Sequence, residues 1–181
     1  MKFCLLLILM YLPLNVYSFD QIRNGPFVSL AMGVNINQSN LNLLDNTTVL
    51  LQDAGSSFQF RMGSGALKRL SVFSMLNQRN YFNQEEQGGY FITDVGLGAQ
   101  YYFTSYIRTA YLMGSAATAV SKYKNENVNI GKTFQLGVGY EIVGNWQLEL
   151  SWMGTNSKIN HTLYNQLDSQ SVQLTINYIW Y

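Results

Sequence analysis

The chain contains little charge, little proline, one histidine and one cysteine. Of its 181 residues, 12% are charged, two are proline, and the only cysteine is Cys4. One cysteine excludes a scaffold of internal disulfides, and one histidine cannot form a usual metal site unaided. The longest apolar run, at the N-terminus, is shorter than the ~20 residues of a membrane-spanning helix. With a mean hydropathy near zero, we expect neither a disulfide-rich protein, nor a metal or cofactor site, nor a helical membrane protein.

The first 18 residues have the pattern of a secretory signal peptide. Lys2 supplies the positive start, residues 3–12 form the apolar core, and Ser18 is a small residue at the cleavage site. We expect cleavage after this residue and a single mature domain at 19–181; the alternative is an uncleaved anchor. Cys4 lies away from the cleavage site, so no lipoprotein signal is present. Without Lys2 the chain has ten basic and ten acidic side chains, a balance that disfavours nucleic acid as a partner.

What the chain does contain is apolar alternation, which is clearest between residues 134 and 152. Apolar side chains occupy every second position from Phe134 to Ile142 and again from Trp146 to Trp152, with polar residues or glycine between them. Two such strands joined by a tight turn predict a β-hairpin. Ile142 should pair with Trp146, leaving Val143-Gly144-Asn145 as a three-residue loop, because a two-residue loop would put the apolar sets on opposite faces.

The same alternation divides the rest of the mature chain into strands, separated alternately by long polar segments and short turns. An all-β, eight-stranded, up-and-down antiparallel transmembrane β-barrel has this pattern, with four long extracellular loops and short periplasmic turns. Its first strand must pair with its last, because lipid tolerates no open sheet edge. The expected strands cover residues 25–36, 57–66, 70–77, 90–103, 107–120, 134–142, 146–152 and 171–181, and the expected long loops cover residues 37–56, 78–89, 121–131 and 156–170. The Leu and Val residues of the segment 37–56 indicate that it is partly ordered and extends the flanking strands.

Two of these strands have an ambiguous phase. For the third we place Leu70, Val72 and Leu76 outward, although Phe73 and Met75 compete for that face. The fifth is rich in small residues and does not favour either phase.

Outward-facing aromatic residues should form girdles at the two membrane interfaces. Near the short-turn rim we expect Phe27, Phe103, Trp146 and Trp180, and near the long-loop rim Phe58, Phe91, Phe134 and Trp152.

The mature chain resembles the small eight-stranded outer-membrane barrels of Gram-negative bacteria, the superfamily of the opacity proteins, OmpX and the OmpA barrel, with OmpW-like barrels as a variant. The resemblance is carried by GPFVSLAMGVNI, FQLGVGYEIVGNWQLELSW and the aromatic end SVQLTINYIWY. It implies a bacterial outer-membrane location and contact with outer-membrane lipid and lipopolysaccharide. It also implies a signal in the last strand for the barrel-insertion machinery, at Tyr178, Trp180 and Tyr181. Strict alternation puts Trp180 rather than Tyr181 on the lipid face, so either the end is bulged or Trp180 has this role.

Charged side chains share the inward face by parity: Arg61, Asp94, Glu141 and Glu149. In the hairpin Glu141 should face Gln147, which makes it a diagonal neighbour of Glu149. One interpretation is an acid/base pair for glycoside hydrolysis. The favoured one is an ion network inside the barrel, because buried charges need partners and an eight-stranded barrel has little room for substrate. Such a network, with Arg108 or Lys132 as further members, could gate a narrow pore.

The only histidine, His161, lies in the fourth expected loop. The resemblance includes lipid A deacylases and palmitoyltransferases, which use His and Ser at the barrel surface or rim. A deacylase-type His-x-Ser arrangement is absent because Leu163 occupies the third position, whereas a site assembled from separate loops stays open. The Gly-x-Gly pairs at Gly96/Gly98 and Gly137/Gly139 are not nucleotide loops, because no helix follows them; we expect them to face a crowded interior.

Three functions therefore remain. The first is a non-enzymatic barrel with loops for adhesion or host-factor binding and a role in envelope integrity, for which no catalytic residue is expected. The second is a narrow pore or an OmpW-like conduit for small hydrophobic compounds. The third is a lipid A-modifying enzyme. A soluble lipocalin-like barrel is the structural alternative, and it would need the apolar faces inside.

Overall fold

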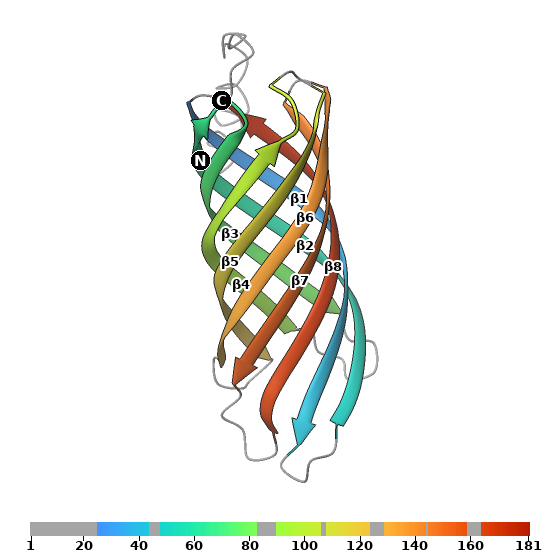
Figure 1. Ribbon diagram of the computed structural model, residues 1–181. Coiled ribbons are helices and arrows are strands. Elements are labelled where there is room, and N and C mark those ends of the chain that lie inside the picture. Colours follow the sequence, from blue (N-terminus) through green and yellow to red (C-terminus); the bar gives the residue numbers. More distant parts are fainter. Residues whose placement is uncertain are drawn as a thin grey trace, which may run out of the picture.

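Alternation gives each strand one apolar and one polar face, and eight such strands wind around a common axis (Figure 1). The computed structural model describes residues 25–43, 48–82, 90–105, 108–123, 129–143, 145–158 and 164–181. The predicted signal peptide, Ile107 and His161 lie outside these ranges. Within them, no helix is long and apolar enough to cross a membrane.

Each strand pairs antiparallel with the next, and β1 pairs with β8, which closes the barrel. The closing ladder runs from the pair Val28 and Trp180 to the pair Leu43 and Tyr164. The expected fold class is confirmed. The strands are β1 (Pro26–Leu43), β2 (Thr48–Leu67), β3 (Leu70–Phe82), β4 (Tyr90–Tyr102), β5 (Ala110–Tyr123), β6 (Asn129–Val143), β7 (Trp146–Lys158) and β8 (Tyr164–Trp180).

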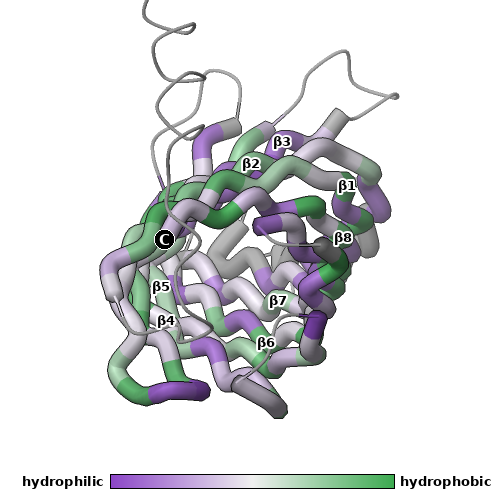
Figure 2. The backbone as a smooth tube through the Cα atoms, turned by 90° about the horizontal axis from the view of Figure 1, so that it is seen from above, coloured by the Kyte–Doolittle hydropathy of each residue, from purple (hydrophilic) through white to green (hydrophobic). Residues whose placement is uncertain are grey.

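The start of β1 and the end of β8 lie at the same end of the barrel (Figure 1). We call this the terminal end; it is the predicted short-turn rim, and it also carries the β2–β3, β4–β5 and β6–β7 connections. The opposite end, the loop end, carries the other four connections. Seen along its axis, the barrel is a ring of strands whose hydropathy changes from residue to residue along each of them (Figure 2).

The strands extend further toward the loop end than the apolar pattern predicts. The β1–β2 ladder continues to the pair Asn42 and Thr48, so most of the expected loop 37–56 is strand. The expected loops 78–89, 121–131 and 156–170 are likewise partly strand. Apolar alternation marks only the part of a strand that faces lipid, whereas backbone hydrogen bonds continue through the polar residues beyond it. The boundaries predicted for the loops are therefore wrong, whereas the expected extension of the flanking strands into the segment 37–56 is confirmed.

Two turns at the terminal end also differ from expectation. Val143, not Ile142, pairs with Trp146, and the register shifts between Glu141 and Val143. A bulge in β6 thus replaces the expected three-residue loop and leaves both Ile142 and Trp146 exposed on the outer wall. The β4–β5 connection is longer than expected, since β5 begins at Ala110 rather than residue 107.

The outer wall is apolar and the interior is largely polar. Leu97, Ile36 and Met32 are 70, 69 and 66% exposed on the wall, whereas Gln59, Gln135 and Gln173 are fully buried inside. This inverts the usual arrangement of a water-soluble barrel, so a lipocalin-like fold is excluded. A continuous exposed apolar wall matches a hydrocarbon surrounding.

The outward choice for the third strand is confirmed, because Val72 and Leu76 are exposed while Phe73 and Met75 are buried. In the fifth strand, Leu112 faces outward and Tyr111 and Met113 face inward.

Phe27 was expected in the outer girdle, and this prediction is wrong. It has the opposite parity to Val28 and is buried inside the terminal end, packed with Phe73, Met75 and Ile179. Tyr181 and Ala117 pack against this apolar cluster.

Candidate functional site

The first candidate group inside the barrel is an ion pair between β2 and β7. Arg61 Nη2 lies 2.6 Å from Glu149 Oε1, and its Nη1 lies 2.9 Å from Oε2, so the pair is bidentate. Gln59 accepts a further hydrogen bond from the guanidinium at 2.7 Å, and Tyr111 donates to Glu149 at 3.0 Å. The Phe73 ring lies beneath the guanidinium, 5.1 Å from its carbon.

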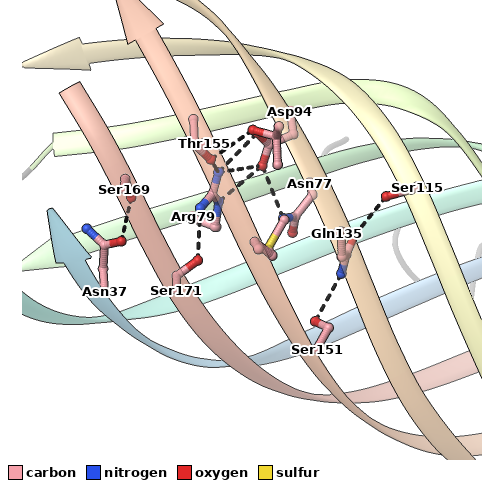
Figure 3. A network of polar contacts seen from close by, with 12 residues as sticks. Asn37, Asn77, Arg79, Asp94, Ser115, Gln135, Ser151, Thr155, Ser169 and Ser171 are labelled. Atoms are coloured by element: carbon pink, nitrogen blue, oxygen red, sulfur yellow. Dashed lines mark hydrogen bonds and ion pairs between the residues drawn. The ribbon is translucent and has the colours of Figure 1, made fainter. Parts of the chain in front are cut away.

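A second ion pair lies closer to the loop end, between neighbouring strands β3 and β4 (Figure 3). Arg79 Nη2 lies 3.0 Å from Asp94 and its Nε lies 3.1 Å from the same carboxylate. Thr133 donates to Asp94 at 2.7 Å, while Thr155 and Ser171 each accept from Arg79 at 3.0 Å. Both charged side chains are fully buried, and the surrounding hydroxyls supply the hydrogen bonds that a buried pair requires.

These two pairs correct the single network expected around Arg61. Asp94 is bound by Arg79, a residue of the polar segment 78–89 that was expected to be a loop. The inward position of Arg79 could be predicted from the alternation of the strand, since Arg79 is an even number of residues from the inward-facing Phe73 and Met75 of β3. Arg108 and Lys132, the suggested further members, are exposed on the surface.

Glu141 lies nearer the terminal end, where it faces Gln147 in the expected register. Its side chain is buried, and its backbone N–H donates to the Thr109 carbonyl at 3.0 Å. The carboxylate that engages Arg61 is that of Glu149, and both of its oxygens accept hydrogen bonds. Among the described residues, no group of three or more metal-binding side chains is close enough to hold a metal ion.

Large side chains fill the interior by lying over the inward glycines. A Cβ added at Gly139 would overlap the Tyr111 ring, and one at Gly98 would meet the Phe73 ring at 2.6 Å. The paired strands place each ring directly opposite its glycine. One glycine of each Gly-x-Gly motif, Gly98 and Gly139, therefore provides space for a ring inside the barrel.

Apart from Phe27, the aromatic residues expected on the lipid face lie on the outer wall. The exposed ones are Phe58, Phe91, Phe103, Phe134, Trp146 and Trp152. Trp180 is half-buried there against Tyr178, with ring centroids 4.6 Å apart. Tyr181 turns to the interior side and packs against Phe27 at 6.3 Å. The alternation thus continues to the end of β8, and Trp180 is the last outward aromatic.

Three solved structures share this fold over most of the chain. Neisserial surface protein A aligns with a TM-score of 0.58 and 14% identity over 86% of this chain and 99% of its own. Ail, the attachment invasion locus protein of Yersinia pestis, gives 0.55 and 13% over 86% and 99%. The outer membrane protein OprG from Pseudomonas aeruginosa gives 0.51 and 12% over 88% and 98%. No family model and no curated protein matches the sequence. The chain has the fold of the small eight-stranded outer-membrane β-barrels.

Proposed function

We propose that this chain is a non-enzymatic protein of the bacterial outer membrane whose loop end binds a partner at the cell surface. The proposal rests on a contrast between the interior of the barrel, which is filled by its own side chains, and the loop end, where the strands are unusually long. The interior is occupied by two hydrogen-bonded ion pairs and by rings packed over glycines. The strands at the loop end, however, extend well past the length that a membrane requires, as β1 and β2 with 18 and 20 residues illustrate.

Longer strands stabilise a raised rim on which connecting segments are presented, and such segments usually carry the function of a rigid scaffold. One structural neighbour supports this use, since Ail is described as an attachment and invasion protein and one of its structures contains the heparin analogue sucrose octasulfate. The ligand chemistry should differ here. The four connecting segments at this end contain four acidic residues and one basic residue. The acidic residues are Asp45, Glu85, Glu86 and Glu126, and the basic residue is Lys124. We therefore propose a neutral or cationic partner surface rather than a sulfated polysaccharide.

Adhesion of bacteria that produce the protein to epithelial monolayers tests this function. Residues 83–89 and 159–163 are replaced by Gly/Ser segments of equal length, and the control carries Lys68→Gln and Arg69→Gln in the turn at the terminal end. We expect the loop variant to lose adhesion and the control to keep it, with the same heat-modifiable migration for both. Full adhesion of the folded loop variant would remove the proposal.

A second candidate, a narrow pore, is favoured by one group of side chains. Asn35, Ser57 and Gln173 are buried on β1, β2 and β8, and their polar side-chain atoms have no hydrogen-bond partner. Buried polar atoms of this kind are commonly satisfied by internal water, so this side of the interior can hold a line of water. Recording from the folded protein in planar bilayers decides between the candidates: discrete conductance steps support the pore, and their absence removes it.

A further inference from the structure

A carboxylate without an ion pair lies inside the barrel at the loop end. Asp53 on β2 is 8% exposed and forms no ion pair with another described residue. Its Oδ2 accepts a 3.1 Å hydrogen bond from the Tyr90 hydroxyl. Asp94, in contrast, is paired with Arg79 and also accepts from Thr133. Because a largely buried charge is ordinarily balanced by a cation, the surroundings of Asp53 indicate what could balance this one.

Side chains from three other strands fix the position of this carboxylate. Tyr90 reaches Asp53 from β4, and its hydroxyl also accepts a 2.7 Å hydrogen bond from Asn37, the residue that pairs with Asp53 in the β1–β2 ladder. The Tyr90 ring stacks on Tyr81, with ring centroids 4.7 Å apart. Ser169 on β8 donates to Asn37 at 2.6 Å. The Tyr90 hydroxyl thus engages one oxygen of Asp53 and leaves the other to a further partner.

Three buried polar side chains beside Asp53 have polar atoms without a hydrogen-bond partner; they are Asn35, Ser57 and Gln173. Asn35 lies opposite Gly55, which stands between Asp53 and Ser57 on the inward face of β2. Asn35 Oδ1 is 3.0 Å from the position that a Cβ on Gly55 would take, so this side chain points into the space that the glycine leaves. Gln173 pairs with Asn35 from the side of β8. Diagonal neighbours on one face of such a ladder lie about 7–8 Å apart, which leaves room for a small ion between their side chains.

The chemistry of these groups selects a cation of single charge. Internal water can satisfy the amides and the hydroxyl, but it does not balance the charge of Asp53. The available oxygens come from one carboxylate, two amides and one hydroxyl, which are ligands for hard cations and acceptors for an ammonium group. Because the binding of a divalent ion depends on the number of charged ligands, one carboxylate favours a monovalent cation.

We propose that the loop end of the barrel binds a monovalent cation, an alkali ion or an ammonium group, between the Asp53 carboxylate and the side chains of Asn35, Ser57 and Gln173. Asp53 is the most exposed of the four, so the cation enters from the loop end. The proposal depends neither on adhesion nor on the pore, because the site needs access from one end and no path through the barrel.

NMR of the folded protein in detergent micelles measures this binding at the site itself, through the side-chain amide signals of Asn35 and Gln173. Potassium, sodium, methylammonium and calcium chlorides are titrated separately, with the bulky cation N-methylglucamine keeping the ionic strength constant. Asp53→Asn removes the charge and keeps the shape, and Gln173→Leu removes one amide. The matched control is Asp168→Asn, which changes a carboxylate of β8 that is hydrogen-bonded to the exposed Asn156.

We expect the two amide signals to shift saturably with a monovalent cation. A response to potassium or sodium alone would assign an alkali ion, and a response to methylammonium alone would assign an amine ligand. Asp53→Asn should weaken the binding about tenfold or more, because a charge beside the ion acts through a medium less polarisable than water. Gln173→Leu should weaken it less, and Asp168→Asn should leave it unchanged.

Three results would overturn the proposal. The first is the absence of a saturable response to any monovalent cation, which would mean that the site holds water only. The second is tighter binding of calcium than of every monovalent cation. The third is unchanged affinity in folded Asp53→Asn or in Gln173→Leu, and the latter variant decides the matter if Asp53→Asn does not fold. Heat-modifiable migration identifies the folded variants.

Discussion

At the scale of single residues, the described interior of the barrel holds two ion pairs that are separate from each other. Arg61 and Glu149 reach each other across the barrel from β2 and β7, whereas Arg79 and Asp94 lie on adjacent strands. Each pair has its own hydrogen-bond partners. A buried charge that loses its partner keeps its desolvation cost, whereas removal of both charges of a pair removes that cost as well.

Removal of one charged side chain of a pair should therefore lower the free energy of unfolding much more than removal of both. We expect Arg79→Met to lower the free energy of unfolding by about 3–5 kcal/mol, because Asp94 is left charged and fully buried. The double variant Arg79→Met/Asp94→Leu should recover most of this loss. Urea unfolding in lipid vesicles, followed by tryptophan fluorescence, measures both, and the exposed Arg69→Met serves as the control. A double variant as unstable as the single one would show that the pair itself supplies the stability.

The sequence could predict which residues face inward, but not which of them meet. Parity placed Arg61, Asp94 and Glu149 inside because period-two alternation is a local property of a strand. The partner of Asp94 was missed because Arg79 lies in a polar stretch that resembles a loop. The contact between Arg61 and Glu149 depends on the full closure of the sheet and on side-chain length, neither of which a strand pattern contains.

At the scale of elements, the middle of the wall and the rim at the loop end should respond differently to the same introduced charge. Leu150 on β7 lies in the apolar middle of the wall and is exposed there, whereas Gln170 on β8 is exposed nearer the loop end, where it pairs with Gln38 on β1. We expect Leu150→Arg to destabilise the folded barrel by ~2–4 kcal/mol and Gln170→Arg by ~0–1 kcal/mol. Equilibrium folding into vesicles gives both values. Equal effects would mean that the outer wall does not face hydrocarbon.

The extent of the elements was the least predictable part of the fold. The apolar pattern identified all eight strands because lipid selects outward side chains along each of them. It could not show where β1 and β2 end, since the ladder there depends on backbone hydrogen bonds between polar residues such as Asn37 and Asp53. The bulge at Ile142 could not be predicted for a different reason. A bulge with a two-residue turn and an unbulged three-residue loop both put Ile142 and Trp146 on the same face, so the apolar pattern does not distinguish them.

At the scale of the whole molecule, closure joins the first strand to the last, and the two final aromatic residues contribute to it from opposite sides. Trp180 lies on the outer wall opposite Val28, while Tyr181 packs on the inner side against Phe27. If the insertion machinery reads an outward aromatic residue in the last strand, assembly in cells should depend on Trp180, and interior packing should depend on Tyr181.

Two measurements separate these roles. We expect Trp180→Ala to reduce the fraction of folded protein in the outer membrane of cells several-fold, yet to refold into lipid vesicles at nearly the normal rate, because no machinery is needed there. Tyr181→Ala should insert in cells but unfold at lower urea concentration, because it loses ring contacts with the buried cluster around Phe27. If Trp180→Ala is equally impaired in vesicles, its role lies in the stability of the wall. In that case the signal for assembly must come from another residue of β8, and Tyr178, whose ring lies between those of Trp146 and Trp180, is the next to test.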